Sequence, residues 1–257
     1  MITRRAARSA PGACGKIRVT LKPAKPSFDD FAETYDDLLR DPIRSRFSAD
    51  GNRFFHLRKC ELIRGYYQRR GIDTRRLAML DLGCGKGELL RLLRPGFAEA
   101  AGCDPSPEML ASGQLGANGI AARVQTGATS IPFEAARFDL VTAVCVYHHV
   151  EPGLRDRLTA EARRVLKPGG VFAVIEHNPY NPATRLIVSR TPVDAGAELL
   201  TPAATRRLFR RSGFQLTEQR YFLYFPERVY PRLRGLERLL RRVPLGGQYA
   251  VFGTWVP

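Results

Sequence analysis

Residues 80–90 read LDLGCGKGELL, and this stretch decides the fold. An apolar run at 77–80 leads into it and is typical of a buried strand, which Asp81 ends. Three glycines at alternate positions follow, just before a helical pattern: Gly83, Gly85 and Gly87. A strand, a glycine turn and a helix in this order let the backbone approach a ligand closely. Glycine has no Cβ atom in the way, and a helix N-terminus offers free N–H groups.

A second acidic residue, Asp104, ends the next apolar strand, at 98–103. A carboxylate at the tip of the second strand can accept hydrogen bonds from the two hydroxyls of a ribose. The glycine spacing is G-x-G-x-G, which differs from the G-x-G-x-x-G of dinucleotide-binding turns. The ligand is therefore expected to carry a ribose without being the usual dinucleotide.

LDLGCGKGELL at 80–90 and GCDPSPEML at 102–110 resemble the class I S-adenosylmethionine (SAM)-dependent methyltransferases. The closest branch is the type 11 small-molecule one, which includes the ubiquinone and menaquinone C-methylases. RVLKPGGVFAVIEHNP at 164–179 is a further match. The resemblance covers roughly 28–256. It implies an α/β, Rossmann-like fold with a seven-stranded, mostly parallel sheet, helices on both faces and an N-terminal helical lid.

The same resemblance implies SAM as the cofactor and assigns its contacts. Tyr35 would lie near the methionine end and Met109 against the adenine, although core packing remains an alternative for both. Gly127 stands where the family commonly has an aspartate that accepts a hydrogen bond from the adenine amino group, so the backbone beside it would have to read the adenine. The implied cofactor residues are Tyr35, Asp81, Gly83, Cys84, Gly85, Gly87, Asp104, Pro105, Met109, Ala128, Thr129 and Val146.

Candidate catalytic residues follow the apolar strand at 138–146. The end of this strand is where the resemblance places the reacting methyl group, and parallel sheets bind ligands at such ends. An acidic acceptor proton needs a base, and histidine has a suitable pKa. His149 is the first candidate, followed by His148 and His177, and a structural or pocket-lining role remains open for each. No carboxylate cluster indicates a metal, so none is expected.

The remaining pattern predicts helices at 28–40, 52–70, 151–166 and 201–212, and strands at 121–125, 171–176, 214–222 and 248–256. A turn is expected at 167–170, and polar residues in the loop after 176 suit acceptor contacts or local capping. The domain prediction is a basic disordered tail at 1–26 and one methyltransferase domain at 27–257. That domain divides into a helical lid at 27–75 and a core at 76–257, with a basic amphipathic insertion at about 226–244.

Charge is distributed unevenly along the chain. The net charge is +16, yet residues 1–26 contribute +7 and residues 201–257 contribute +8, which leaves the core nearly neutral. The tail is read as a solvated segment, with an organelle transit peptide or a basic arm as alternatives. Five cysteines without a C-x-x-C pair indicate free thiols in a reducing compartment. The expected location is the cytoplasm, with membrane association left open.

Residues 228–243 have apolar residues at four-three-four-three spacing among arginines. Such a helix can lie on an anionic membrane, pack on the sheet with a solvated basic rim, or contact nucleic acid. The expected partner is a small-molecule or lipid-like acceptor, whereas the neutral core argues against nucleic acid. The sequence does not indicate the acceptor, the methylated atom or the oligomeric state.

The leading hypothesis is therefore a SAM-dependent methyltransferase with a small-molecule or lipid-linked acceptor. An RNA methyltransferase is the alternative within the same chemistry, suggested by the net charge. A non-catalytic SAM-binding partner subunit is an alternative of another class. An NAD-dependent oxidoreductase of the short-chain type is disfavoured, because no tyrosine has a lysine four residues later.

Overall fold

The computed structural model describes residues 28–48 and 51–256, so the predicted tail and Cys14 lie outside the described residues. One sheet of seven strands runs through the molecule in the order β3-β2-β1-β4-β5-β7-β6, with β7 antiparallel to both of its neighbours. The strands are β1 (Ala78–Leu82), β2 (Glu99–Asp104), β3 (Ala121–Val124), β4 (Phe138–Val144), β5 (Leu166–His177), β6 (Phe214–Phe222) and β7 (Gln248–Trp255). The predicted fold class is confirmed.

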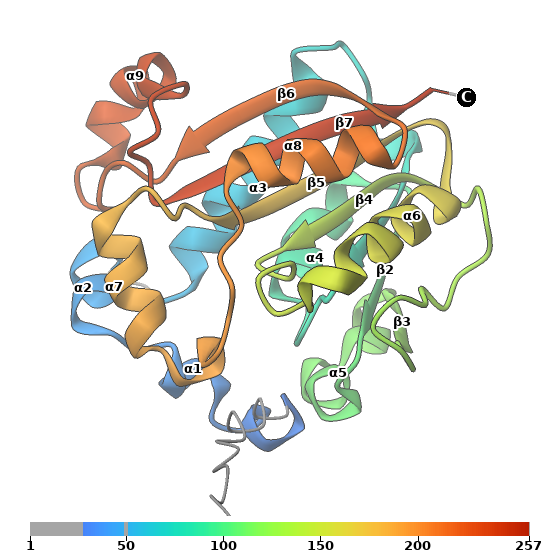
Figure 1. The fold of residues 1–257 in the computed structure, drawn as a ribbon, viewed down its shortest axis with the longest axis horizontal. Helices are drawn as coiled ribbons and strands as arrows, with labels where there is room; N and C mark the ends of the chain where they lie inside the picture. Colours follow the sequence, from blue (N-terminus) through green and yellow to red (C-terminus); the bar gives the residue numbers. More distant parts are fainter. Residues whose placement is uncertain (1–27, 49–50, 257) are drawn as a thin grey trace, which may run out of the picture.

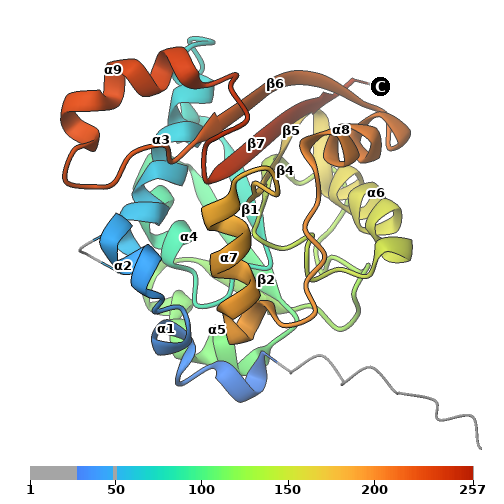
Figure 2. The ribbon, with the colours of Figure 1, turned by 60° about the vertical axis from the view of Figure 1, so that its left-hand side comes forward.

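Nine α-helices are described: α1 (Tyr35–Leu38), α2 (Pro42–Phe47), α3 (Arg53–Gln68), α4 (Glu88–Leu93), α5 (Pro107–Gly113), α6 (Arg155–Val165), α7 (Pro182–Arg190), α8 (Pro202–Arg211) and α9 (Tyr230–Leu240). Figures 1 and 2 show α6 and α8 on one face of the sheet and α3 and α4 on the other. Short helices α1, α2 and α7 lie together beyond the carboxyl ends of the parallel strands. Within the described ranges, no helix is both long and apolar enough to cross a membrane.

Two hydrophobic cores fill the spaces between the sheet and its helices. Successive residues of β1 point to opposite faces, so Leu80 joins the core under α6 and α8 while Met79 joins the core under α3 and α4. Leu158 and Phe209 close the first core, and Ile63 closes the second. All five side chains are almost fully buried, so the sheet is fixed from both sides.

The strand order reverses between β1 and β4, which pair on either side of the centre with Leu82 opposite Ala143. The chain therefore leaves β1 toward β2 and leaves β4 toward β5, in opposite directions across the sheet. Loops that diverge in this way leave a crevice at the carboxyl ends of the strands, which is where ligands bind in such sheets. This crevice receives the glycine loop and the three candidate histidines.

Two local predictions are wrong. The expected single helix over 28–40 is instead a 3-10 turn at Asp29–Phe31 followed by the one-turn helix α1. The following Asp41 is extended, as a residue before proline prefers, and its carboxylate caps α2 by accepting from the Ile43 N–H. The turn expected at 167–170 lies inside β5, where a register shift opposite Phe138 and Leu140 absorbs the Pro-Gly-Gly segment.

Candidate active site

The glycine loop after β1 is held against β2. The N–H groups of Gly83 and Cys84 both donate to the Cys103 carbonyl, at 2.8 and 3.0 Å. Gly83 has a φ of +68°, and a Cβ atom there would lie 2.6 Å from Val146 Cγ2 at the end of β4. Only glycine therefore lets the loop pass this close to β4. The result is a short backbone cradle at the centre of the crevice.

Gly87 allows a direct test of the cradle. Its φ is +74°, and an added Cβ would lie 2.2 Å from Leu115 Cδ2. Gly119 has a similar φ of +64°, but an added Cβ there would have no atom within 4 Å. A substitution at Gly119 therefore measures the backbone strain without any steric overlap. We expect Gly119→Ala to cost about 1–2 kcal/mol of unfolding free energy, and Gly87→Ala roughly 1–3 kcal/mol more because it also overpacks the core. Urea unfolding of both variants measures the difference, and equal losses would contradict it.

Asp104 links the loop to the end of β2. Its Oδ2 accepts from the Gly85 N–H at 2.7 Å, and its Oδ1 accepts from the Ser106 N–H at 2.9 Å. Burial raises the pKa of Asp104, against the effect of these two N–H groups. A carboxylate has about four acceptor positions, so two remain for hydroxyl groups. Asp104 can therefore hold the glycine loop and bind a ribose at the same time.

Asp81 and Lys59 bring charge to the same cleft. Asp81 accepts from Thr142 Oγ1 at 2.6 Å, and burial raises its pKa to about 7. Lys59 on α3 is also buried and lines the cleft. Sequence analysis missed Lys59 because nothing in the amphipathic pattern of 52–70 distinguishes a lysine at the cleft from one at the helix boundary. A buried cation here suits a carboxylate ligand.

The three candidate histidines come together at the other wall of the cleft. The ring centroids of His148 and His149 are 4.1 Å apart, and those of His148 and His177 are 5.1 Å apart. His148 Nδ1 lies 2.5 Å from Glu176 Oε2, and Asp194 lies within 3.5 Å of both neighbouring histidines. The structure therefore groups the predicted histidines with two carboxylates that sequence analysis did not select.

The charge states of these histidines differ. Burial would lower the pKa of His148, but the carboxylates of Glu176 and Asp194 outweigh it and raise that pKa to about 10. The pKa of His149 is lowered, mainly by burial. His148 is therefore a poor general base at neutral pH, whereas His149 is neutral.

Cys145 directly follows β4 in a left-handed conformation, with a φ of +57°. Burial would raise the pKa of its thiol, but Lys59 and His177 lower it to about 7. Burial raises the pKa values of Cys60, Cys84 and Cys103. Among the cysteines that the structure describes, Cys145 is therefore the one expected to be a thiolate near neutrality.

We expect iodoacetamide to modify Cys145 with a half-maximal rate near pH 7. Because a nearby cation favours the thiolate, Lys59→Met should move this midpoint to higher pH. Peptide mapping by mass spectrometry separates the Cys145 signal from that of Cys14. A midpoint near pH 9 in the unsubstituted protein would show that Lys59 and His177 do not act on this thiol.

Two cavities meet at this site. The cofactor cleft has a volume of about 120 Å³ and is lined by several predicted residues: Tyr35, Asp81, Gly83, Cys84, Gly85, His148, His149 and His177. A second cavity of about 270 Å³ lies between α2, α3 and α7, with Phe47, Phe55, Ile187 and Leu223 in its walls. Both cavities share Arg44, His177 and Gln248. The polar cleft therefore borders an apolar compartment.

The remaining predicted cofactor residues do not line the cleft: Gly87, Asp104, Pro105, Met109, Ala128, Thr129 and Val146. Three of them lie next to the cradle, outside the cavity itself. Asp104 binds the Gly85 N–H, Val146 faces Gly83, and the Met109 methyl would lie 3.6 Å from a Cβ at position 85. The exposed Pro105 and the loop at 128–129, which the resemblance places near the adenine, lie outside the cavity.

A salt bridge connects α1, in the segment predicted to be a lid, to the glycine loop. Lys86 Nζ of the glycine loop lies 3.0 Å from Asp36 Oδ2 on α1, and 5.9 Å from the Tyr35 ring centroid. The cleft is smaller than the roughly 300 Å³ or more that a ligand of cofactor size needs. We therefore expect α1 to move outward when a cofactor binds.

Comparison with known proteins identifies the central part of the chain. A family model described as a methyltransferase domain matches residues 80–174, from β1 through the glycine loop, the histidines and most of β5. Residues 80–174 thus resemble a methyltransferase domain. The domain implies SAM as the cofactor, and the glycine cradle, Asp104 and buried Lys59 fit its backbone contacts, ribose and carboxylate.

Relatives of this domain agree with the match. An uncharacterized methyltransferase of Synechocystis is 36% identical over 104 residues, which cover 40% of this chain and 49% of the relative. A ubiquinone biosynthesis O-methyltransferase of Nitrobacter winogradskyi is 29% identical over 163 residues, covering 58% of this chain and 61% of the relative. This chain thus spans about half to three fifths of the length of these two methyltransferases.

A SAM-dependent methyltransferase of Thermotoga maritima has the same fold. It superimposes with a TM-score of 0.62 over 88% of this chain and 97% of its own, at 16% identity. At this identity the likeness concerns the fold alone.

Proposed function

We propose that this protein transfers a methyl group from SAM to a small-molecule or lipid-linked acceptor with an apolar body. The observation that carries the proposal is the apolar cavity of about 270 Å³ that shares Arg44, His177 and Gln248 with the cofactor cleft. An acceptor in this cavity would present its reactive atom to the cleft at these shared residues. The similarity to a ubiquinone biosynthesis O-methyltransferase supports an acceptor of this class.

When bound, SAM supplies a methyl group that its sulfonium already activates. The protein then has mainly to align the reacting atoms, which is an effect of proximity and orientation. Asp104 would hold the ribose, and Lys59 would pair with the cofactor's carboxylate. His177 borders both cavities and would take the acceptor's proton. We prefer it to His149, the first candidate from the sequence, because His149 faces Asp194.

Tritiated-methyl SAM and an extract of the native source test the proposal. Products are separated into organic, aqueous small-molecule, nucleic-acid and protein fractions, and label in either of the first two supports it. Label in nucleic acid would favour an RNA methyltransferase instead. SAM binding without any transfer would favour the non-catalytic partner subunit.

A substitution at His177 tests its role in the same assay. We expect His177→Ala to reduce transfer by about 100-fold or more, as loss of a general base does, with SAM affinity nearly unchanged. A parallel loss of SAM affinity would show that His177 acts in binding the cofactor rather than on the acceptor.

Contact with an anionic membrane surface through α9 is the second part of the proposal. The apolar stripe predicted at 228–243 is exposed or half-buried: Val229, Leu233, Leu236, Leu240 and Val243. The helix instead buries Tyr230 and Glu237 against α3, where Arg58 pairs with Glu237. Leu239 is 80% exposed. This arrangement favours surface contact over packing on the sheet, and would place the protein in the cytoplasm at a membrane.

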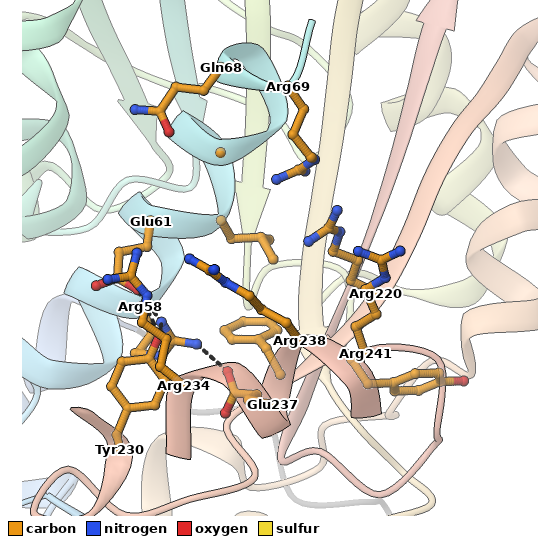
Figure 3. Close-up of a pocket in the computed structure, with 14 residues that line it drawn as sticks. Arg58, Glu61, Gln68, Arg69, Arg220, Tyr230, Arg234, Glu237, Arg238 and Arg241 are labelled. Atoms are coloured by element: carbon orange, nitrogen blue, oxygen red, sulfur yellow. Dashed lines mark hydrogen bonds and ion pairs between the residues drawn. The ribbon is translucent and has the colours of Figure 1, made fainter. Parts of the chain in front are cut away.

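An arginine-lined cavity beside α9 gives this surface its charge. Figure 3 shows arginines from α3, β6 and α9 around a hollow of about 410 Å³. Of these, Arg234, Arg238 and Arg241 form no ion pair with any described residue, whereas Arg58, Arg69 and Arg220 pair with glutamates. Unpaired guanidinium groups beside exposed leucines complement lipid phosphates and the apolar layer below them.

Vesicle sedimentation tests this contact. We expect binding to phosphatidylglycerol vesicles, no binding to phosphatidylcholine, and about fivefold weaker binding for Arg238→Gln, since a basic residue near such a surface contributes about 1 kcal/mol. Arg207→Gln on α8 removes an equal charge from another face and serves as the control. Equal effects of the two variants would show that binding depends on the net charge of the protein and not on this surface. RNA binding at physiological salt would favour nucleic acid as the partner of α9.

A further inference from the structure

Two imidazole rings and one carboxylate, those of His148, His149 and Asp194, converge on one point in the cleft. His148 Nε2 lies 3.4 Å from Asp194 Oδ1, and His149 Nε2 lies 3.5 Å from the same oxygen. All three ligand-type atoms lie within 4.8 Å of one another. The histidines follow β4, and Asp194 ends the 3-10 turn Pro192–Asp194 after α7.

The two distances to Asp194 Oδ1 match those between neighbouring ligands of a small tetrahedral metal ion. Zinc binds imidazole nitrogen and carboxylate oxygen at about 2.0–2.2 Å, and tetrahedral angles then place neighbouring ligand atoms roughly 3.3–3.6 Å apart. Both Asp194 contacts fall in this interval. Two histidines and one carboxylate also form a common donor set of catalytic zinc sites, which keep a fourth position open.

His148 is oriented as a metal-binding histidine would be. Its Nδ1 faces Glu176 Oε2 at 2.5 Å, while Glu176 Oε1 accepts from the N–H groups of Val146 and Tyr147 at 3.0 and 2.7 Å. A carboxylate on one ring nitrogen fixes the ring and directs the other nitrogen to the metal. Here that other nitrogen is fully buried and has no hydrogen-bond partner among the described residues.

A protonated His148 between two carboxylates is the competing explanation. Such a cation would be expected to form a short hydrogen bond on each side, because a buried donor without an acceptor is costly. The bond is formed toward Glu176 but not toward Asp194, which is shared with His149 at nearly equal distance. Asp194 lies at nearly equal, long distances from His148 and His149, and this arrangement fits an ion between the three side chains better than an ion pair with one histidine.

We propose that His148, His149 and Asp194 bind one divalent first-row transition metal ion, with zinc as the ion tested. All three residues line the cofactor cleft. If the proposed methyl transfer holds, the open position would bind an oxygen or nitrogen atom of the acceptor and make its proton easier to remove. The metal site itself rests on the geometry and not on that activity.

The test uses the full chain, treated with a chelator and then dialysed, without cofactor or acceptor. We expect it to bind one zinc ion per chain by elemental analysis and calorimetry. Cobalt(II) at the same site should give the intense visible absorption of a tetrahedral complex. Because neither measurement involves methyl transfer, failure of the metal site and failure of the proposed activity are distinguishable.

Substitutions test which residues bind the metal ion. Asp194→Asn and His149→Gln should each weaken zinc binding by about 100-fold or more. Glu176→Gln should weaken it by about 10–100-fold, the usual effect of an outer-shell change. Asp156→Asn, an exposed carboxylate paired with Arg211, is the matched control and should have no effect. Circular dichroism establishes that each variant is folded.

Two results would overturn the proposal. One is a folded, unsubstituted protein that binds neither zinc nor cobalt stoichiometrically. The other is zinc binding that Asp194→Asn and His149→Gln leave intact, which would place the ion elsewhere.

Discussion

Asp104→Asn is expected to weaken SAM binding by about 100-fold. In the unsubstituted protein the Gly85 and Ser106 N–H groups each donate to one carboxylate oxygen of Asp104. The asparagine keeps one acceptor oxygen, but its NH₂ group faces one of these two N–H groups. Hydrogen bonds to a charged group contribute about 1.5–3 kcal/mol each, and a loss of 2.7 kcal/mol is a factor of about 100. The loop and the ribose site are affected together because one carboxylate serves both.

Calorimetry with SAM measures this change. Asp73→Asn is the matched control, since it makes the same chemical change in an exposed carboxylate that accepts only from Arg75. We expect it to leave SAM affinity unaltered. An Asp104 variant that binds SAM within about threefold of the unsubstituted protein would remove Asp104 from the ribose site.

Glu176→Gln is expected to lower the unfolding free energy by about 3–5 kcal/mol, as breaking a buried ion pair does. Glu176 is fully buried, and it both pairs with His148 and accepts from two backbone N–H groups after β4. Burial would raise the pKa of Glu176, but His148 outweighs it and lowers that pKa. In the metal-free protein, the substitution therefore leaves a buried imidazolium without its nearest counter-charge.

Thermal unfolding followed by circular dichroism should show a melting temperature roughly 10 °C lower, at about 2–4 °C per kcal/mol for a chain of this size. Glu161→Gln provides the comparison, because its partner Arg164 is partly exposed and such pairs contribute at most about 1 kcal/mol. If both variants melt at the same temperature, Glu176 does not hold this part of the sheet together.

The strands were predictable because their apolar runs and end residues are local features. The glycine spacing and Asp104 were sufficient to locate the cradle, since both lie at strand ends that a parallel sheet brings to one edge. The glycine loop and Asp104 follow the neighbouring strands β1 and β2, so their proximity could be predicted without knowing the course of any connecting loop.

Other features of the fold and the site could not be predicted, because they depend on tertiary structure. The residues of 28–40 have helical spacing, yet a helix of this length is marginal in isolation, and here the segment covers the cleft as short turns. Asp194 could not be linked to His148 from the sequence, because their meeting depends on the path of α7 and the turn after it. Lys59 and Glu176 look like ordinary charged residues until their burial is known.

The salt bridge between Lys86 and Asp36 has a consequence for kinetics. Asp36 is largely exposed, so dissolved salt screens the pair, which contributes at most about 1 kcal/mol. Breaking it frees α1 from the glycine loop without disturbing the sheet. Higher ionic strength should therefore speed association of the cofactor with little effect on its residence time, because the outward movement of α1 on binding separates this pair in the complex.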